Sequence, residues 1–266
     1  KAALMPFHRW LPAAMVAPTP VSALLHAVAV VKAGVFCVVK VIVYVLGADT
    51  LARLGSAEWL PYLAGFTIIA ASVVALRSDN LKRRLAYSTV SQLSYVVLAA
   101  SLLTPLSVAA AAFHIAAHAV SKITLFFAAG AIYTAAHKTE VSELAGIGRA
   151  MPLTMGAFAI GAFSLIGVPP AVGFLSKWMI LQGAVEAGRH AALAVILVST
   201  LLNAAYFLPI VHAAFFRPLP EGEQRHGEAP WPMLVALVAT ASLSIALFFF
   251  SAPALQLSRQ LAGLTP

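Results

Sequence analysis

The stretch AAFHIAAHAVSKITLFFAAG (residues 111–130) decides how this chain is organised. It is apolar almost throughout, yet it carries His114, His118 and Lys122. About 20 predominantly apolar residues are enough for one helix to cross a membrane. The spacing i, i+4, i+8 places the three side chains along one helix face, with a drift of about 40° per step. The stretch therefore predicts a transmembrane helix with a row of ionisable side chains.

Such a row is costly in a membrane. A charge at the bilayer centre costs roughly 2.5–3.5 kcal/mol on insertion scales, so it is typical of an interior or of a functional site. Histidine both accepts and donates protons near neutral pH, and burial disfavours the charged form of a lysine. The pattern indicates exchangeable proton sites that water would connect. Hydrogen bonds that only fix helix packing are the alternative.

The composition agrees with a membrane protein. Of 266 residues, 61% are hydrophobic and 10% are charged, whereas soluble domains carry about 25% charged residues. We predict an all-α fold, a polytopic transmembrane helix bundle of about seven spans. The net charge of +8 is expected from basic cytoplasmic loops rather than from nucleic-acid binding. Cys37 is the one cysteine, which excludes an intrachain disulfide.

The predicted single spans are separated by polar segments. Residues 48–58 are expected to form a loop, RSDNLKRRL (77–85) is the densest charge cluster, and 137–149 is a polar loop. The spans are expected at 20–47, 59–76, 85–103, 106–136, 190–216 and 231–250.

Orientation follows from the loop cations, because cytoplasmic loops are enriched in lysine and arginine. Nine of them fall on one side of this layout: Arg9, Arg77, Lys82, Arg83, Arg84, Lys138, Arg149, Arg217 and Arg225. Three fall on the other: Arg53, Arg189 and Arg259. The first group is therefore expected in the cytoplasm. Five lysines belong to no loop: Lys1, Lys32, Lys40, Lys122 and Lys177.

Proline breaks two further segments. KAALMPFHRWLPAAMVAPT (1–19) holds three prolines and is expected to be the end of a kinked span with a short re-entrant piece. Residues 151–186 are too long for one span and are interrupted by GVPP (167–170). Paired broken helices are typical of inverted-repeat transporters.

The remaining lysines differ in their surroundings. Lys177, in GVPPAVGFLSKW (167–178), is either an interior residue or one that snorkels beside Trp178. His26 and Lys32 are six residues apart, so they do not share a helix face. Lys40, nearer the expected helix end, is interpreted as snorkelling. The stripe YSTVSQLSY (87–95) either hydrates a channel or joins helices.

Three motifs together resemble the antiporter-like proton-pumping subunits of respiratory complex I and of Mrp-type antiporters. They are KAALMPFHRWLPAAMVAPTPVSALLHA, HIAAHAVSKITLFFAAG and GVPPAVGFLSKW. The resemblance implies two inverted repeats, with 1–47 the tail of the first, 59–216 the second, and 217–266 a loop and a C-terminal transmembrane helix. Because Lys1 falls inside a motif, we expect an N-terminal part, with an acidic partner, to be missing.

The resemblance also implies roles for residues. Lys1, Lys122 and Lys177 would be the lysine of the first break, the central carrier and the outlet. His26, His114 and His118 would hydrate or bridge the path, and Lys32 depends on the branch of the family. PAAM and HAVAVVKAGVF favour a branch like the D-type large subunits of Mrp antiporters.

The expected function is translocation of protons, alone or in Na⁺/H⁺ antiport, by a multi-pass subunit of a larger complex in the bacterial inner membrane. A proton-pumping subunit of NADH-quinone oxidoreductase or of a membrane-bound hydrogenase is the alternative within the family. A redox subunit that binds quinone or haem, and a scaffold subunit, are alternatives outside it. No cofactor or metal is expected, because no ligand motif is present. Other membrane subunits and lipid are the expected partners.

Overall fold

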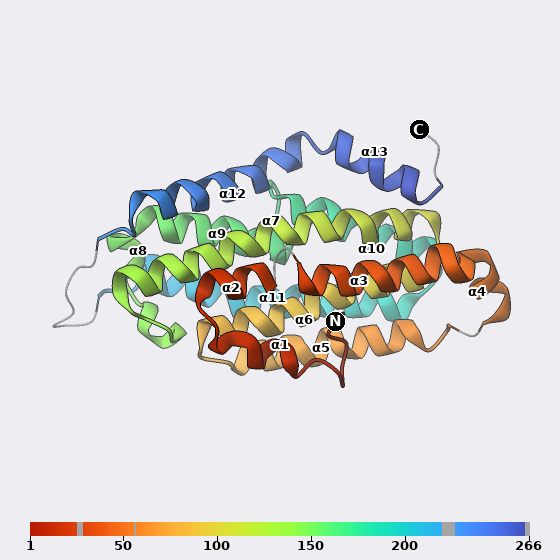
Figure 1. The fold of residues 1–266 in the computed structure, drawn as a ribbon, viewed down its shortest axis with the longest axis horizontal. Coiled ribbons are helices and arrows are strands. Elements are labelled where there is room, and N and C mark those ends of the chain that lie inside the picture. Colours follow the sequence, from red (N-terminus) through yellow and green to blue (C-terminus); the bar gives the residue numbers. More distant parts are fainter. Residues whose placement is uncertain (26–28, 56, 220–226, 264–266) are drawn as a thin grey trace.

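The computed structural model describes residues 1–25, 29–55, 57–219 and 227–263. These residues form an elongated bundle of helices, and α7 runs along its long axis (Figure 1). No strand occurs in the described part of the chain, where an isolated bridge pairs Asn80 with Glu140. The predicted all-α helix bundle is confirmed.

The elements follow one another along the chain as short pieces and then long helices. They are α1 (Trp10–Ala13), η1 (Ala14–Val16), α2 (Thr19–Ala23), α3 (Val30–Lys40), η3 (Val41–Gly47), α4 (Ala48–Leu54), α5 (Leu60–Arg77), α6 (Leu81–Ser101), α7 (Pro105–Ala136), η4 (Val141–Leu144), α8 (Ile147–Ala150), α9 (Pro152–Ile166), α10 (Val172–Glu186), α11 (His190–Phe216), α12 (Trp231–Phe249) and α13 (Ala252–Leu261).

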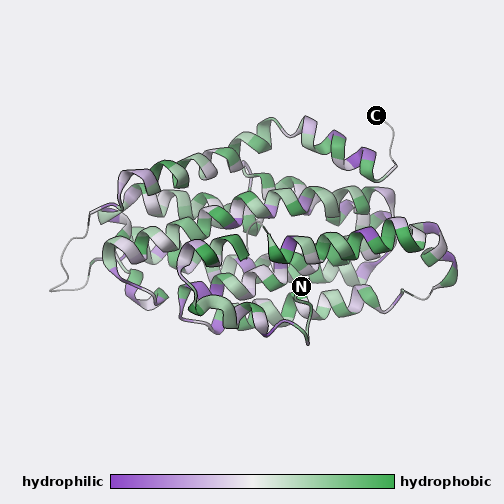
Figure 2. Cartoon of the chain, viewed as in Figure 1, coloured by the Kyte–Doolittle hydropathy of each residue, from purple (hydrophilic) through white to green (hydrophobic). Residues whose placement is uncertain are grey.

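Five helical runs in the described residues are long and apolar enough to cross a membrane: Val30–Leu54, Leu60–Arg77, Pro105–Ala136, His190–Phe216 and Trp231–Phe249. Apolar residues dominate the helices along their length (Figure 2). Two other helices lie among these five. Helix α6 is almost wholly buried, and helix α9 is shorter than the five.

The first predicted span differs from the observed one. We predicted a helix over 20–47 and a loop over 48–58, which is wrong in two places. Residues 26–28 lie outside the described part of the chain, the chain bends at Ala29 before α3 begins at Val30, and the helical run then passes through Gly47 into α4. Gly47 has a φ of 81°, which changes the direction of the backbone without ending the helical run. The following ADTLARL resumes the helix with Asp49 in its first turn, a favourable place for a carboxylate.

The N-terminal segment is also less helical than predicted. No helix precedes Trp10 in the described chain, and only the short elements α1 and η1 follow before Pro18, so the end of a kinked span expected within 1–19 is not seen there. Pro6, Pro12 and Pro18 each lack the N–H that a helix interior needs. The backbone of Lys1 and Ala2 instead packs directly on α3, where a Cβ at Gly34 would lie 2.4 Å from the Ala2 nitrogen.

Helix α6 starts four residues earlier than the predicted span at 85–103. The Asn80 side chain accepts a hydrogen bond of 3.1 Å from the Arg83 nitrogen and so caps the helix at Leu81. The charge cluster is therefore partly helical. Arg84 is not a loop cation: it is 8% exposed and donates to the carbonyls of Ser78 (2.8 Å) and Tyr206 (3.0 Å).

The predicted break inside 151–186 is confirmed. Helix α9 ends at Ile166 and α10 begins at Val172, with Gly167 at a φ of 93° between them. The two helices then pack closely, because a Cβ at Gly173 would lie 1.8 Å from the Ser164 carbonyl oxygen. Only glycine fits at this contact. Helix α13 was not predicted, and it contacts α7.

Candidate functional site

Three lysines of the described chain lie in the bundle interior. Lys32 on α3 is 7% exposed, Lys122 on α7 is 0% exposed, and Lys177 on α10 is 6% exposed. His114 and His118 on α7 are 2% and 1% exposed. Each of these side chains therefore has to find its partners inside the protein.

Lys32 and His118 are in direct contact. The Lys32 Nζ and the His118 Nδ1 form a buried hydrogen bond between α3 and α7. An ammonium group can only donate, and then the Nδ1 accepts; a neutral amine can accept, and then the Nδ1–H donates. Two proton placements satisfy the same contact, so a proton can change sides without breaking it.

His114 lies one turn before His118, with ring centroids 6.2 Å apart. Its Nδ1 is 2.9 Å from the Ser176 Oγ on α10, and that hydroxyl donates to the Gly173 carbonyl at 3.0 Å. With its proton used there, Ser176 accepts from an Nδ1–H. The His114 Nε2 then carries the lone pair, and it has no hydrogen-bond partner among the described residues.

Lys122 turns to another helix. Its Nζ donates to the Leu85 carbonyl at 2.9 Å and to the Ser88 hydroxyl, both on α6. The ammonium also lies 5.9 Å from the centroid of the Phe207 ring on α11. His118 and Lys122 are four residues apart, an angular drift of about 40°, and their side chains reach different helices, α3 and α6.

Lys177 is held by the break between α9 and α10. Its Nζ donates to the Ile166 carbonyl at 3.1 Å and lies 5.1 Å above the Tyr95 ring. In a continuous helix that carbonyl would bond the N–H of residue 170, which is proline and has none. Lys177 supplies the missing donor. It is thus an interior residue, while its neighbour Trp178 is 50% exposed.

The second proline leaves a second carbonyl without its helical partner. Leu165 would bond the N–H of residue 169, again a proline. Its oxygen instead accepts from Gln92 Nε2 at 3.4 Å and from Asn203 Nδ2 at 3.5 Å. Asn203 was not predicted as a site residue, although a lone amide in the apolar α11 is a usable signal.

Four side chains of the polar stripe on α6 are fully buried and border these groups: Ser88, Ser91, Gln92 and Tyr95. Ser88 contacts Lys122, Gln92 contacts the break, and Tyr95 lies beneath Lys177. Ser91 hydrogen-bonds Ser72 on α5 at 2.9 Å. The stripe both joins helices and borders the buried lysines. Ser176 was likewise not predicted; it lies beside Lys177 in a motif whose prolines and lysine are its more conspicuous features.

No aspartate or glutamate is buried in the described part of the chain. The three interior lysines thus lie among hydroxyls, carbonyls, rings and histidines. Within the same residues, no group of three or more His, Cys, Asp or Glu side chains could hold a metal ion.

Two further lysines, Lys1 and Lys40, lie apart from this interior. Lys1 is exposed at the terminus, and Lys40 is exposed with its Nζ 5.6 Å from the centroid of the Phe36 ring. His26 lies outside the described residues.

Comparisons with known proteins agree on one family. Residues 1–203 match the family described as NADH:quinone oxidoreductase/Mrp antiporter, TM. NADH-quinone oxidoreductase subunit N of Desulforudis audaxviator is 38% identical over 87% of this chain and 46% of its own length. The A/B subunit of a probable K(+)/H(+) antiporter of Rhizobium meliloti is 36% identical over 86% of this chain and 23% of its own. The chain thus spans less than half the length of these relatives.

The fold is similar to that of a solved structure as well. A chain of the Mrp complex from Dietzia sp. DQ12-45-1b superposes with a TM-score of 0.89 at 22% identity, over 98% of this chain and 56% of that one.

Proposed function

The chain belongs to the NADH:quinone oxidoreductase/Mrp antiporter transmembrane family, and from that premise we propose that it is an ion-translocating subunit of a multisubunit membrane complex. It is a multi-pass membrane protein of an antiporter-like family. The transported ion is the proton, alone or in exchange for a cation such as Na⁺. The relatives named as complex I and antiporter subunits support this assignment.

One observation carries the proposal: Lys32 and His118, from different helices, share a buried hydrogen bond with no carboxylate nearby in the described chain. A contact meant only to join two helices does not need two titratable groups, each costly to bury. Two such groups in contact can pass a proton, and His114 extends the row by one helical turn.

We propose roles for these residues from the family resemblance. Lys32, His118 and His114 form the exchangeable row, Lys122 is the central carrier on α7, and Lys177 is the outlet at the break. Lys1 and His26 would belong to a first half-path. In this division, 1–47 is the tail of one repeat, 59–216 is a second repeat, and 217–266 carries a loop and the last transmembrane helix. A bacterial inner membrane is the proposed location.

The branch of the family is also a proposal. The motifs PAAM and HAVAVVKAGVF favour an assembly like the Mrp antiporter, with this chain in the place of its D-type large subunit. The 38% identity to an N subunit favours the alternative, a proton-pumping subunit of an NADH-quinone oxidoreductase. A Na⁺ dependence of proton transport by the intact complex would decide for the antiporter.

Lys122→Ala in the intact complex tests the function. Proton transport by native membrane vesicles should fall by at least about tenfold, the effect of roughly 1.4 kcal/mol on a rate. The amount of assembled complex should stay near that of the wild type. Lys40→Ala is the matched control, because Lys40 is an exposed lysine. Normal transport by Lys122→Ala would refute the carrier role.

A further inference from the structure

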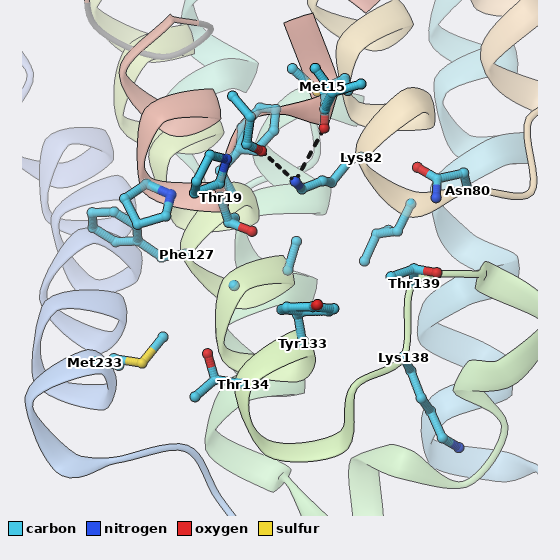
Figure 3. Close-up of a pocket in the computed structure, with 18 of the residues that line it drawn as sticks. Met15, Thr19, Asn80, Lys82, Phe127, Tyr133, Thr134, Lys138, Thr139 and Met233 are labelled. Atoms are coloured by element: carbon cyan, nitrogen blue, oxygen red, sulfur yellow. Dashed lines mark hydrogen bonds between the residues drawn. The ribbon is translucent and has the colours of Figure 1, made fainter.

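A groove on the outside of the bundle is separate from the buried lysines and histidines, because none of them lines it. It encloses about 900 Å³ between the η1–α2 connection, the start of α6, the second half of α7 and the start of α12 (Figure 3). Its apolar wall includes Phe127, Met233 and Ala236. Its polar end includes Asn80, Lys82 and Thr139.

The groove opens toward the apolar surface of the bundle. Val16, on its edge, is 95% exposed. Trp231, next to the lining residue Pro232, is 75% exposed at the start of α12. Tryptophan is enriched where a membrane meets water. Exposed apolar side chains therefore flank the groove on two sides.

The length of the groove fits one leaflet. Along α7 and its end, lining residues extend from Phe126 to Lys138. The lining residues on α7 itself run from Phe126 to Thr134, a helical rise of about 12 Å, which is comparable with half of the ~30 Å hydrocarbon core. An occupant that fills the groove thus needs a long apolar part, which a small polar solute lacks.

At the polar end of the groove, the Lys82 ammonium has one N–H donor more than its two hydrogen bonds use. The Lys82 Nζ donates to the Ala17 carbonyl at 2.9 Å and to the Met15 carbonyl at 3.3 Å. These bonds hold the ammonium at the groove (Figure 3). An ammonium has three N–H donors, so one remains for a further acceptor.

Charge favours an anion at this end. Among the described residues that line the groove, two are lysines and none is acidic. The carboxylates next in sequence to lining residues already have partners. Asp79 accepts from the Ser142 nitrogen at 3.1 Å and hydroxyl at 2.7 Å. Glu140 accepts from Asn80 at 3.0 Å and Thr139 at 3.1 Å. Basic groups at the cytoplasmic surface attract anionic lipid headgroups.

We propose that this groove binds an anionic phospholipid, with its phosphate on Lys82 and an acyl chain along Phe127, Met233 and Ala236. The bound lipid would seal the η1–α2 connection against α7 and α12. The proposal is independent of whether the buried lysines and histidines carry ions.

The test uses the intact complex, purified in mild detergent and delipidated. It is titrated with phosphatidylglycerol or with phosphatidylcholine, and bound lipid is counted by native mass spectrometry. We expect phosphatidylglycerol to bind more tightly. Lys82→Gln should weaken it about fivefold, the contribution of one lysine near an anionic headgroup, whereas the exposed neighbour Arg83→Gln should not.

A second pair of variants keeps the test decisive if Lys82→Gln fails to assemble. Ala236→Trp should fill the groove and abolish tight binding, while Ala239→Trp, on the same helix but outside the lining, should not. Equal binding by these two variants, or no preference for phosphatidylglycerol in the wild type, would overturn the proposal. So would a cross-link from Ala236→Cys to another polypeptide, which would identify a protein occupant.

Discussion

Two regions of the interior hold their lysines in different ways. Where α3 meets α7, Lys32 is bonded to His118, a side chain that itself gains and loses protons. Where α7, α9 and α10 meet α6, Lys122 and Lys177 donate to the backbone carbonyls of Leu85 and Ile166. A carbonyl accepts a hydrogen bond but does not take up a proton at physiological pH.

The difference separates two tasks. A lysine that is hydrogen-bonded to a histidine can transfer its proton to that partner. A lysine that is hydrogen-bonded to a carbonyl keeps its proton until another acceptor reaches it. Arg84 is an example of a cation that carbonyls hold and that never exchanges its proton. It donates to two carbonyls, and arginine stays charged. Lys122 and Lys177 resemble Arg84 in their partners but, unlike it, can lose a proton.

The largest effect is expected from Lys32→Met, which removes one of the two exchangeable groups in contact. Proton transport by vesicles that contain the intact complex should fall at least about tenfold, with assembly unchanged. Lys40→Met, eight residues along the same helical run but exposed, should transport as the wild type. Equal transport by the two variants would remove the distinction drawn between Lys32 and the carbonyl-held lysines.

Arg84→Met is expected to lower stability without any role in proton exchange. It leaves the Ser78 and Tyr206 carbonyls without their charged donor, and each such bond contributes about 1.5–3 kcal/mol. The thermal midpoint of the detergent-solubilised complex should therefore drop. Arg83→Met, at an exposed position, should leave the midpoint near that of the wild type. A midpoint lowered equally by both would show that the carbonyl contacts of Arg84 contribute nothing specific.

A smaller stability effect is expected at Lys177. Lys177→Met leaves the Ile166 carbonyl without a donor, at a cost of about 1–3 kcal/mol, and Lys177→Gln should recover part of that cost through its amide N–H groups. Both variants should lose transport, since neither side chain carries a proton. If Lys177→Gln recovers transport together with the thermal midpoint, then Lys177 only closes the proline break.

The sequence predicts the α7 row well but not its partners. Spacing alone places His114, His118 and Lys122 along one helix, and all three are buried. The pairing of Lys32 with His118 joins residues 86 positions apart, and only the packing of α3 on α7 brings them together. Spacing places His26 and Lys32 on different faces, but it says nothing about which helix each face meets.

The break between α9 and α10 was predictable for a local reason. Two adjacent prolines remove two N–H groups, so the helix has to stop and two carbonyls need other donors. Which side chains supply those donors depends on tertiary packing: Lys177 returns from α10, and Gln92 and Asn203 come from other helices. The helix that continues past Gly47 was missed because a positive φ redirects a chain without always ending its helix.

The central claim is that the buried histidines of α7 carry protons rather than fix helix packing. The most direct test is the double variant His114→Gln/His118→Gln in the intact complex, with proton transport measured in membrane vesicles at equal amounts of assembled protein. Glutamine keeps hydrogen-bond donors and acceptors but does not titrate. We predict an assembled complex whose proton transport is lost. An assembled complex that transports protons at the wild-type rate would contradict the account.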